Sequence, residues 1–334
     1  MALSGTQEKT QANSGSAFSC DVPKSVRDSC YEYRGVIMPS FMSLRCMKAL
    51  ENFEVRPDDT FIITYPKSGT TWLQQITLLA KFEGDASQME GKHITQLSPF
   101  LDEVDLFTSL DIDEAPSVAD QAKELPSPRI LKSHCLTDWL PAEIRTDDPK
   151  VKVIYVVRNP KDTAASYYNF CQLIGQLPSY ESWDVFFEEF LAGRAPQGSW
   201  FENVLPWWRR RNHPNVLFLK YEDMKKDLRT AVEQIAQFMG KSFSEDVIDR
   251  IVEASTFSAM KKSKSANPDS IIASVTNVTK EDTKKSETKK SEGSFMRKGA
   301  IGDWKNYFSA EQNRRFDELY AKEMAGSGLE LQFE

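Results

Sequence analysis

The sequence predicts an α/β fold: a single three-layer domain in which a central parallel sheet is flanked by helices. Apolar runs typical of strands alternate with amphipathic helical stretches along most of the 334 residues. The segment 151–157 is almost continuously apolar and β-branched, as expected of a strand that is covered on both faces. A polar turn at 67–69 joins another apolar run directly to a helical pattern. Together these observations favour parallel strands connected by helices.

The strand and helix positions follow from the same patterns. Strands are predicted at 60–65, 129–133, 152–157 and 216–221. Helices are predicted at 70–82, 161–173, 182–192, 203–211, 228–239, 245–254 and 310–325. The last helix has a clear start, because Ser309 followed three residues later by Gln312 forms a capping box.

Two segments stand apart from this regular pattern. Residues 1–20 are rich in Ser, Gln, Gly and Ala and have little apolar surface to bury, so we expect a flexible N-terminal tail before one domain spanning 21–334. Residues 261–294 are rich in Lys, Ser and Thr, which indicates a mobile, solvated loop. A long loop of this kind is also a candidate lid over a site.

Composition excludes several classes of function. The chain has 42 basic and 49 acidic residues, a net charge of −7, which does not suggest nucleic-acid binding. The five cysteines are scattered and lack metal-type spacing, as is typical of a reducing compartment. No apolar run approaches the roughly 18 residues of a membrane span, and the N-terminal residues contain no apolar signal core. We therefore expect a cytoplasmic protein without metal, nucleic-acid or membrane partners.

The turn after the first predicted strand is the most informative segment. It reads Tyr65-Pro66-Lys67-Ser68-Gly69-Thr70-Thr71-Trp72. A strand, a tight turn and a helix point backbone N–H groups and the positive helix end at one spot, and the Lys, Ser and Thr side chains add further donors. The turn is therefore P-loop-like and suited to a phosphate-like oxyanion. It is not a Walker motif, because Lys67 precedes Gly69 and no first glycine stands upstream.

Two further clusters carry basic side chains. Arg158 follows the buried strand, at the sheet edge where open α/β proteins bind ligands, and Ser166 lies in the helix that begins near Pro160. An arginine in this place suits direct recognition of phosphate, whereas a Walker-type ATPase would want an aspartate for magnesium. The other cluster is Arg297-Lys298-Gly299, in which two cations precede a residue that permits close backbone approach.

The three strings together resemble the small-molecule cytosolic sulfotransferases. The resemblance rests on the turn 65–72, on Arg158 with Ser166, and on the Arg-Lys-Gly-x-x-Gly-x-Trp-Lys string at 297–305, and it covers roughly residues 35–330. It implies that the chain uses 3′-phosphoadenosine 5′-phosphosulfate (PAPS) as co-substrate, releases adenosine 3′,5′-bisphosphate (PAP) and needs no metal. The segments 24–43 and 48–54 look nearer to the 6B branch than to the phenol or steroid branches.

The resemblance also assigns donor contacts position by position. Residues Lys67, Ser68, Gly69, Thr70, Thr71 and Trp72 would hold the 5′-phosphosulfate. The 3′-phosphate would be bound by Arg158, Ser166, Arg297, Lys298 and Gly299. The adenine side would be formed by Trp72, Tyr221, Ser255, Thr256, Phe257, Ser258, Ala259 and Met260, with Phe295 and Met296 leading into the Arg-Lys-Gly string.

The catalytic prediction centres on His134. It stands where a predicted strand meets its loop, in Lys132-Ser133-His134, which matches the Lys-x-His string of the family. An acceptor hydroxyl or amine must lose its proton, and an imidazole suits that task near neutral pH. We therefore expect His134 to be the general base. Lys67 would stabilise the leaving oxygen and Lys132 the transferring group. The resemblance further suggests that Lys67 contacts Ser166 before an acceptor arrives.

The acceptor and the oligomeric state are less closely defined. Phe100, Tyr168, Phe170, Lys132 and His134 are the candidate acceptor-site residues, and a phenol is the first expectation, with iodothyronines, steroids and amines also open. Family members often dimerise through Lys-x-x-x-Thr-Val-x-x-x-Glu, whereas the matching positions here read Lys305, Ser309, Ala310 and Arg314. The chain is accordingly expected to be a monomer or a homodimer. A P-loop-like nucleotide kinase and a catalytically inactive nucleotide-binding protein are the alternatives.

Overall fold

Four parallel strands form the centre of the protein. They are β3 (Thr60–Thr64), β4 (Ile130–Ser133), β5 (Lys152–Val157) and β6 (Val216–Lys220), arranged in the order β4-β3-β5-β6. β3 pairs with β4 through Ile63 and Ser133 and with β5 through Ile63 and Tyr155. The chain therefore continues from β3 to one neighbour and later returns to the other. Such a switch in strand order marks the place where ligands bind at the carboxyl ends of the strands.

The structure is a computed structural model that describes residues 23–105, 114–269 and 294–334. The predicted tail at 1–20 and most of the predicted loop at 261–294 lie outside the described residues. Residues 261–262, at the start of that predicted loop, form the end of a helix. Among the described residues, none of the helices has the length and apolar character of a membrane span.

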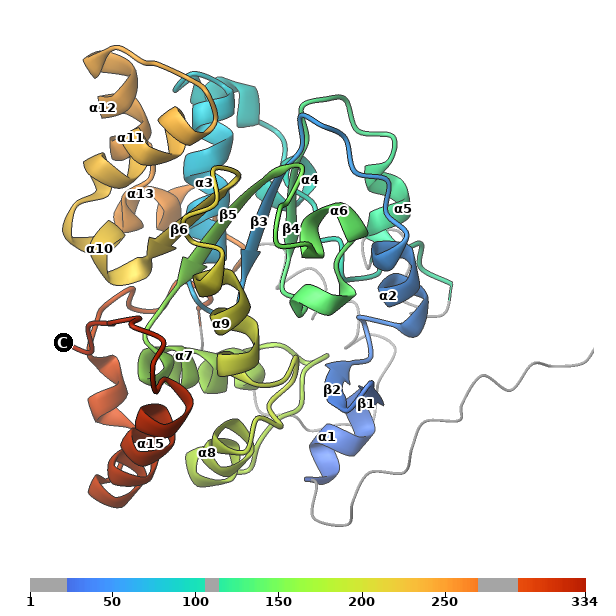
Figure 1. The fold of residues 1–334 in the computed structure, drawn as a ribbon, viewed down its shortest axis with the longest axis vertical. Helices are drawn as coiled ribbons and strands as arrows, with labels where there is room; N and C mark the ends of the chain where they lie inside the picture. The colour runs from blue at the N-terminus through green and yellow to red at the C-terminus, as the bar shows by residue number, and fades with distance from the viewer. Residues whose placement is uncertain (1–22, 106–113, 270–293) are drawn as a thin grey trace, which may run out of the picture.

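Helices surround the sheet (Figure 1). The longer ones are α2 (Leu44–Glu51), α3 (Thr70–Lys81), α7 (Pro160–Leu173), α8 (Trp183–Leu191), α9 (Trp200–Arg209), α11 (Leu228–Phe238), α12 (Glu245–Ala254) and α15 (Ala310–Glu323). The shorter ones are α1 (Lys24–Ser29), α4 (Ile94–Leu97), α5 (Val118–Ala122), α6 (Ala142–Arg145), α10 (Tyr221–Lys226) and α13 (Phe257–Lys262). Single 3₁₀ turns lie at Ala86–Met89, Thr137–Trp139 and Asp303–Asn306.

Each face of the sheet is covered by its own apolar core, as the continuous apolar pattern of β5 predicts. Val153, Tyr155 and Val157 belong to one core together with residues of α2, α7, α8 and α9. Ile154 and Val156 belong to the other core, with α3, α11 and α12. Successive side chains of a strand point to opposite faces, so a strand buried on both sides must be apolar at nearly every position.

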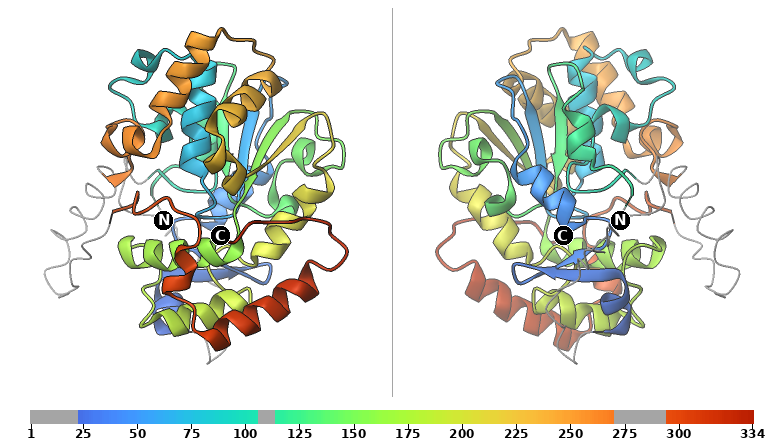
Figure 2. Two further views of the ribbon diagram at one scale, coloured as in Figure 1. Left: turned by 90° about the vertical axis from the view of Figure 1, so that its left-hand side faces the viewer. Right: turned by 90° about the vertical axis from the view of Figure 1, so that its right-hand side faces the viewer.

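The C-terminal segment returns to the sheet edge from which α7 begins. In Figures 1 and 2 the red segment before α15 runs beside α7. Asp162, in the first turn of α7, accepts hydrogen bonds from the backbone N–H groups of Gly302 and Trp304. These contacts bring the predicted Arg-Lys-Gly string at 297–299 to the carboxyl ends of the strands.

Several parts of the fold were not predicted: a hairpin near the N-terminal end of the described residues, and the helices α1, α2, α4, α5, α6, α10 and α13. An antiparallel hairpin is formed by β1 (Cys30–Tyr33) and β2 (Val36–Pro39). Its two turn residues, Arg34 and Gly35, both have positive φ, which gives the backbone the tight reversal that a two-residue hairpin needs. The strands have only four residues each, and all four residues of β2 are buried, so the sequence shows no sustained alternation there.

Candidate active site

The turn between β3 and α3 forms a cradle for an oxyanion. Lys67 and Gly69 both have positive φ (65° and 105°), so the two residues that flank Ser68 take the left-handed conformation before α3 begins at Thr70. A Cβ atom added at Gly69 would lie 2.8 Å from Cδ2 of Tyr221, so only glycine fits beneath that ring. The free N–H groups of the first turn of α3 lie next to the glycine, which makes this end of the helix favourable for a negative charge.

The turn opens into a cavity of about 700 Å³. Nineteen of the predicted site residues line it: Lys67, Gly69, Thr70, Thr71, Trp72, Phe100, Lys132, His134, Arg158, Ser166, Phe170, Tyr221, Phe257, Met260, Phe295, Met296, Arg297, Lys298 and Gly299. They come from α3, β4, α7, α10, α13, the segments that directly follow β3, β4 and β5, the segment around Phe100, and the segment before α15. Segments that are distant in the sequence thus meet at one cavity, at the sheet edge that the strand order indicates.

Six predicted site residues do not line the cavity. They are Ser68, Tyr168, Ser255, Thr256, Ser258 and Ala259. Ser68 is fully buried inside the turn, and its Oγ has no hydrogen-bond partner among the described residues. Ser255 contributes its backbone, because its carbonyl oxygen accepts a 2.7 Å hydrogen bond from Nε1 of Trp72. Thr256 caps α13, whose Phe257 and Met260 reach the cavity in place of the exposed Ser258 and its neighbour Ala259.

The prediction that Tyr168 lines the acceptor pocket is corrected by helix geometry. Ser166, Tyr167 and Phe170 line the cavity from α7, whereas Tyr168 packs against Trp183 and Tyr307, with ring centroids 5.7 and 6.4 Å away. Each residue along a helix turns the side-chain direction by about 100°, so position 168 leaves the face shared by 166 and 170. Tyr167 takes its place.

Arg158 connects the turn to the C-terminal string. Its Nη1 donates to the carbonyl oxygen of Lys67 (3.3 Å) and its Nη2 to that of Ala300 (3.1 Å), while the guanidinium lies 4.6 Å from the centre of the Tyr221 ring. Its buried Nε has no partner among the described residues. A guanidinium with a free N–H beside a glycine-bounded cavity is a good fit to a phosphate group.

Arg297 and Lys298 complete the basic end of the cavity. Both side chains pair with the carboxylate of Asp303, whose pKa is lowered to about 2: burial raises it, but hydrogen bonds from Lys298 and Arg297 outweigh that effect. Gly299 has φ of 60°, and a Cβ atom there would lie 2.6 Å from Cδ2 of Phe257. The cations are thus held in place, and the adjoining backbone is left open. The unpartnered N–H of Arg158, the fixed cations and the two glycines that leave the backbone accessible all fit the phosphate groups of PAPS.

His134 is buried at the end of β4, and its hydrogen bonds define which ring nitrogen is available. Nδ1 lies 2.8 Å from the carbonyl oxygen of Thr64 and 3.0 Å from the hydroxyl of the same residue. A carbonyl oxygen only accepts, so Nδ1 carries the proton and Nε2 carries the lone pair. The backbone N–H of His134 donates to Asp102 at 2.6 Å. Burial and then the positive charge of Lys132 lower the pKa of His134 well below its ordinary value, which keeps the ring neutral.

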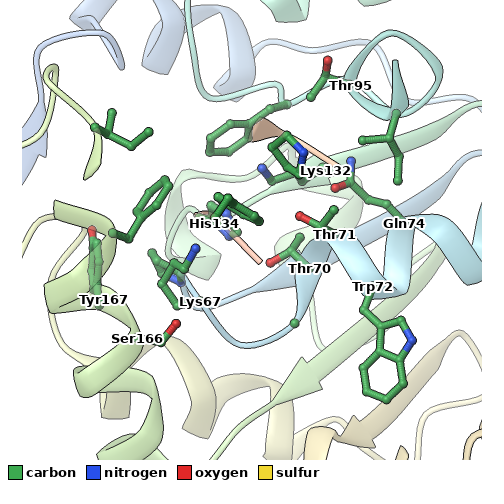
Figure 3. Close-up of a pocket in the computed structure, with 18 of the residues that line it drawn as sticks. Lys67, Thr70, Thr71, Trp72, Gln74, Thr95, Lys132, His134, Ser166 and Tyr167 are labelled. Atoms are coloured by element: carbon green, nitrogen blue, oxygen red, sulfur yellow. The ribbon is translucent and has the colours of Figure 1, made fainter. Parts of the chain in front are cut away.

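Two lysines approach the same region from different elements. Figure 3 shows Lys67 and Lys132 on either side of His134. The Lys67 ammonium lies 3.9 Å from the ring centre of Phe170 and 3.7 Å from that of Phe295, and the Lys132 ammonium lies 3.7 Å from that of Phe100. Burial, together with the nearby positive charges of Lys132 and Arg158, lowers the pKa of Lys67 to about 7. Burial likewise lowers the pKa of Lys132, although Glu103 and Asp102 oppose this.

We expected Lys67 to contact Ser166, but in the structure the Lys67 ammonium contacts aromatic rings instead. Ser166 lines the cavity near Lys67 (Figure 3), but the Lys67 ammonium lies over the two phenylalanine rings. A cation is attracted to the negative face of an aromatic ring, and here two faces are offered at once.

The sequence did not indicate several residues of the site. They are Phe41, Thr64, Asp102, Glu103 and Tyr167. One of them, Thr64, follows from the pairing of β3 with β4: Ile63 lies opposite Ser133, and this register places Thr64 beside His134. Asp102 and Glu103 follow Phe100, which forms a parallel bridge with Lys132 outside the four main strands. That bridge is a tertiary contact that no local pattern announces.

Comparison with known proteins now identifies the family. A family model described as "Sulfotransferase domain" matches residues 57–328. Sulfotransferase 1C2 of Homo sapiens is 38% identical over 280 residues, which cover 84% of this chain and 88% of that protein. Amine sulfotransferase of Oryctolagus cuniculus is 36% identical over 285 residues, covering 85% of this chain and 87% of that protein.

Solved structures agree with the sequence comparison. Mouse sulfotransferase SULT7A1, crystallised in complex with PAP, superposes with a TM-score of 0.70 at 32% identity, covering 90% of this chain and 96% of that chain. Retinol dehydratase, in a complex with retinol and PAP, shares the fold with a TM-score of 0.78 at 23% identity, covering 93% of this chain and 97% of that chain. The alternative of a P-loop-like nucleotide kinase is not favoured. The chain therefore belongs to the sulfotransferase family and is an enzyme that transfers a sulfuryl group from PAPS to a small-molecule acceptor.

Proposed function

We propose that the residues of the cavity divide into a donor half and an acceptor half. In the donor half, residues 67–72 hold the 5′-phosphosulfate through backbone N–H groups and hydroxyls. Arg158, Ser166 and the string 297–299 bind the 3′-phosphate, and Trp72, Tyr221, Phe257 and Met260 enclose the adenine. Two observations support this division. The Nε of Arg158 has no partner among the described residues, and the backbone at Gly69 and Gly299 packs so closely against Tyr221 and Phe257 that a Cβ atom would not fit.

His134 acts as the general base in this proposal. Its Nε2 accepts the proton of the acceptor hydroxyl as the acceptor oxygen bonds to sulfur and the bond from sulfur to the bisphosphate oxygen breaks. The single observation that carries the assignment is the 2.8 Å contact from Nδ1 to the carbonyl oxygen of Thr64, since it leaves the lone pair on Nε2. The imidazole is thus already neutral and correctly oriented, so it needs no change of tautomer before it accepts the proton.

Lys67 and Lys132 stabilise the charge that moves during transfer. Lys67 belongs to the oxyanion turn and is proposed to contact the bridging oxygen that leaves with PAP, while Lys132 is proposed to contact the transferring group. Sulfuryl transfer resembles phosphoryl transfer in depending on in-line positioning and charge stabilisation. The described residues contain no group of three or more His, Cys, Asp or Glu that could hold a metal. The two lysines are proposed to supply the positive charge.

The acceptor half is lined by aromatic and apolar side chains. Phe41, Phe100, Tyr167, Phe170 and Ile174 line it, next to His134 and Lys132. A flat aromatic molecule with a hydroxyl group fits such a lining, so a phenol remains our first proposal for the acceptor. One relative carries the name amine sulfotransferase, so an amine is the second candidate for the acceptor.

We also propose a cytoplasmic enzyme of the 6B branch that is a monomer or a weak homodimer. Arg314, at the position where the family's dimer string has glutamate, forms ion pairs with Glu311 and Glu318 of its own helix. An arginine already held by two carboxylates of α15 does not reproduce a contact that requires a glutamate.

The proposed function is tested by sulfate transfer. The purified chain is incubated with ³⁵S-labelled PAPS and a panel of phenols, iodothyronines, steroids and amines, with and without EDTA. Transfer to at least one phenol that survives EDTA is expected. Binding of PAP without transfer to any acceptor would instead support an inactive nucleotide-binding protein, and loss of transfer with EDTA would contradict the role given to the lysines.

A further inference from the structure

Two carboxylates line the end of the cavity that is proposed to bind the 3′-phosphate. Asp162 lies in the first turn of α7, and Asp303 lies in the 3₁₀ turn before α15. Both are almost fully buried, with 1% and 7% of their surface exposed. A buried negative charge loses hydration and also repels a phosphate group. The contacts of these two side chains must therefore outweigh both costs.

Both oxygens of Asp162 accept hydrogen bonds from backbone N–H groups of the C-terminal segment. Oδ2 accepts from Gly302 at 2.8 Å, and Oδ1 accepts from Trp304 at 2.9 Å. Oδ2 also accepts a 2.9 Å hydrogen bond from Nδ2 of Asn159, the residue that caps α7. Hydrogen bonds of this kind compensate the buried charge. The backbone on either side of Asp303 is thus held by a side chain of α7.

The carboxylate of Asp303 in turn holds the two cations of the string 297–299. Its Oδ1 accepts a 2.5 Å hydrogen bond from Nζ of Lys298, and its Oδ2 lies 2.5 Å from Nη2 of Arg297. A continuous series of contacts therefore runs from the first turn of α7, through the backbone at 302–304, to both cations.

We propose that Asp162 is a positioning residue for the 3′-phosphate of PAPS and that it acts through Asp303. By fixing the backbone on either side of Asp303, it sets where the guanidinium of Arg297 and the ammonium of Lys298 lie before the nucleotide binds. Cations that are already in place lose less conformational entropy on binding. The inference rests on the proposed 3′-phosphate site and adds to it a residue whose own charge opposes the ligand.

The charge and the hydrogen bonds of Asp162 make opposite predictions. If the negative charge were its main effect, Asp162→Asn would tighten the binding of a nucleotide that carries a 3′-phosphate. If its hydrogen bonds position the cations, the same change weakens that binding. An amide has a single acceptor oxygen, so its NH2 group would face one of the two backbone N–H donors. The sign of the effect therefore distinguishes the two roles.

The experiment measures the affinities of the full chain for PAP and for adenosine 5′-monophosphate by calorimetry. The ratio of the two affinities reports recognition of the 3′-phosphate alone. Asp162→Asn should lower this ratio by about tenfold, on the scale of a charge-assisted hydrogen bond. The control is Asp184→Asn, which should keep the ratio. Asp184 also lies in the first turn of a helix and accepts a hydrogen bond from α15, but it lies outside the cavity.

Steady-state sulfate transfer gives a second measurement. In Asp162→Asn the KM for PAPS should rise while kcat at saturating PAPS stays the same, because Lys67, Lys132 and His134 are unaltered. A general disturbance of the fold would lower kcat as well. Thermal unfolding reports whether the variant is folded. If Asp162→Asn does not fold, Asp162→Ser, which also keeps one acceptor oxygen, takes its place with the same expectations.

A double variant tests the route through Asp303. Asp303→Asn should also lower the ratio of affinities, because it releases the same two cations. Combined with Asp162→Asn, it should lower the ratio no further than the larger of the two single losses. Two carboxylates that acted independently would instead give losses that multiply.

Three results would overturn the inference: an unchanged or higher ratio in Asp162→Asn, equal losses of affinity for both nucleotides, or independent losses in the double variant. An unaltered chain that binds both nucleotides alike would refute the proposed 3′-phosphate site and the inference with it. A preference for PAP in the unaltered chain that Asp162→Asn retains leaves the proposed function standing and removes the inference alone.

Discussion

Nδ1 of His134 and the carbonyl oxygen of Thr64 are joined by a 2.8 Å hydrogen bond that links the ends of β4 and β3. The bond uses a backbone group of one strand to orient a side chain of the next. Because the acceptor is a carbonyl, the proton is fixed on Nδ1 and the other nitrogen is free to take a proton from an acceptor.

The first prediction follows directly. His134→Ala should lower kcat by about a hundredfold to ten-thousandfold, as expected for loss of a general base. PAP binding, measured by calorimetry, should change little, because the donor contacts lie in other residues. His213→Ala, which removes a histidine near the surface in contact with Asp148, is the control and should leave kcat unchanged. Turnover of His134→Ala within threefold of the unaltered enzyme would refute the assignment.

The second prediction concerns Arg158. Arg158→Ala should weaken PAP binding by about tenfold to a hundredfold, the effect of losing charge-assisted hydrogen bonds. Adenosine 5′-monophosphate, which lacks the 3′-phosphate, should lose much less. The comparison of two nucleotides on one variant separates phosphate recognition from a general disturbance of the turn that Arg158 also supports. An equal loss for both nucleotides would count against a 3′-phosphate site.

The third prediction uses the pKa of Lys67, which burial lowers to about 7. In the free protein this ammonium is therefore mostly deprotonated above pH 7 and protonated below it. An anionic ligand favours the protonated form, so PAP binding at pH 8 should take up close to one proton at this site, and affinity should fall as the pH rises from 7 to 9. Calorimetry in two buffers of different ionisation enthalpy measures the uptake.

Lys67→Met should remove most of that proton uptake. The matched control is Lys241→Met, at a surface lysine that pairs with Glu83, and it should retain the uptake of the unaltered protein. Proton uptake that is the same in Lys67→Met as in the unaltered protein would show that another group is responsible.

The fourth prediction concerns two glycines with similar backbones. Gly299→Ala and Gly326→Ala both place a side chain at positive φ (60° and 73°), and each should cost about 1–2 kcal/mol of stability. Only Gly299→Ala brings a Cβ atom within 2.6 Å of the Phe257 ring, whereas nothing lies within 4 Å at Gly326. Gly299→Ala alone should therefore weaken PAP binding, by about tenfold on the scale of one displaced ring contact. Thermal unfolding and calorimetry measure the two effects. Similar PAP affinities for both variants would show that the approach of Phe257 to the backbone is unimportant.

The sheet could be predicted from the sequence because its strands are buried on both faces. β5 was predicted with its observed ends, and β3, β4 and β6 to within one residue. Helix α9 was predicted three residues too late, because Ser199 caps the helix with a hydrogen bond to the N–H of Phe201 and allows it to begin at Trp200. The hairpin of β1 and β2 was missed because its short strands show no sustained alternation.

The site could be predicted only where local strings carry it. The turn at 65–72 and the string at 297–299 are contiguous in sequence, and the structure brings them together with Arg158. Thr64, Asp102 and Glu103 depend on which segments pair with β4, and this is a property of the folded chain. Helix phase also escaped prediction at one position, since the face of α7 that reaches the cavity includes Tyr167 and not Tyr168.

The two hydrogen bonds of Arg158 span 91 and 142 residues of sequence, to Lys67 in one direction and to Ala300 in the other. A nascent polypeptide that has emerged only as far as β6 already possesses the sheet and the turn but lacks the carbonyl that holds the far side of this guanidinium. The nucleotide can therefore be recognised only near the end of translation. A chain truncated before residue 300 should fail to bind PAP even if its sheet assembles.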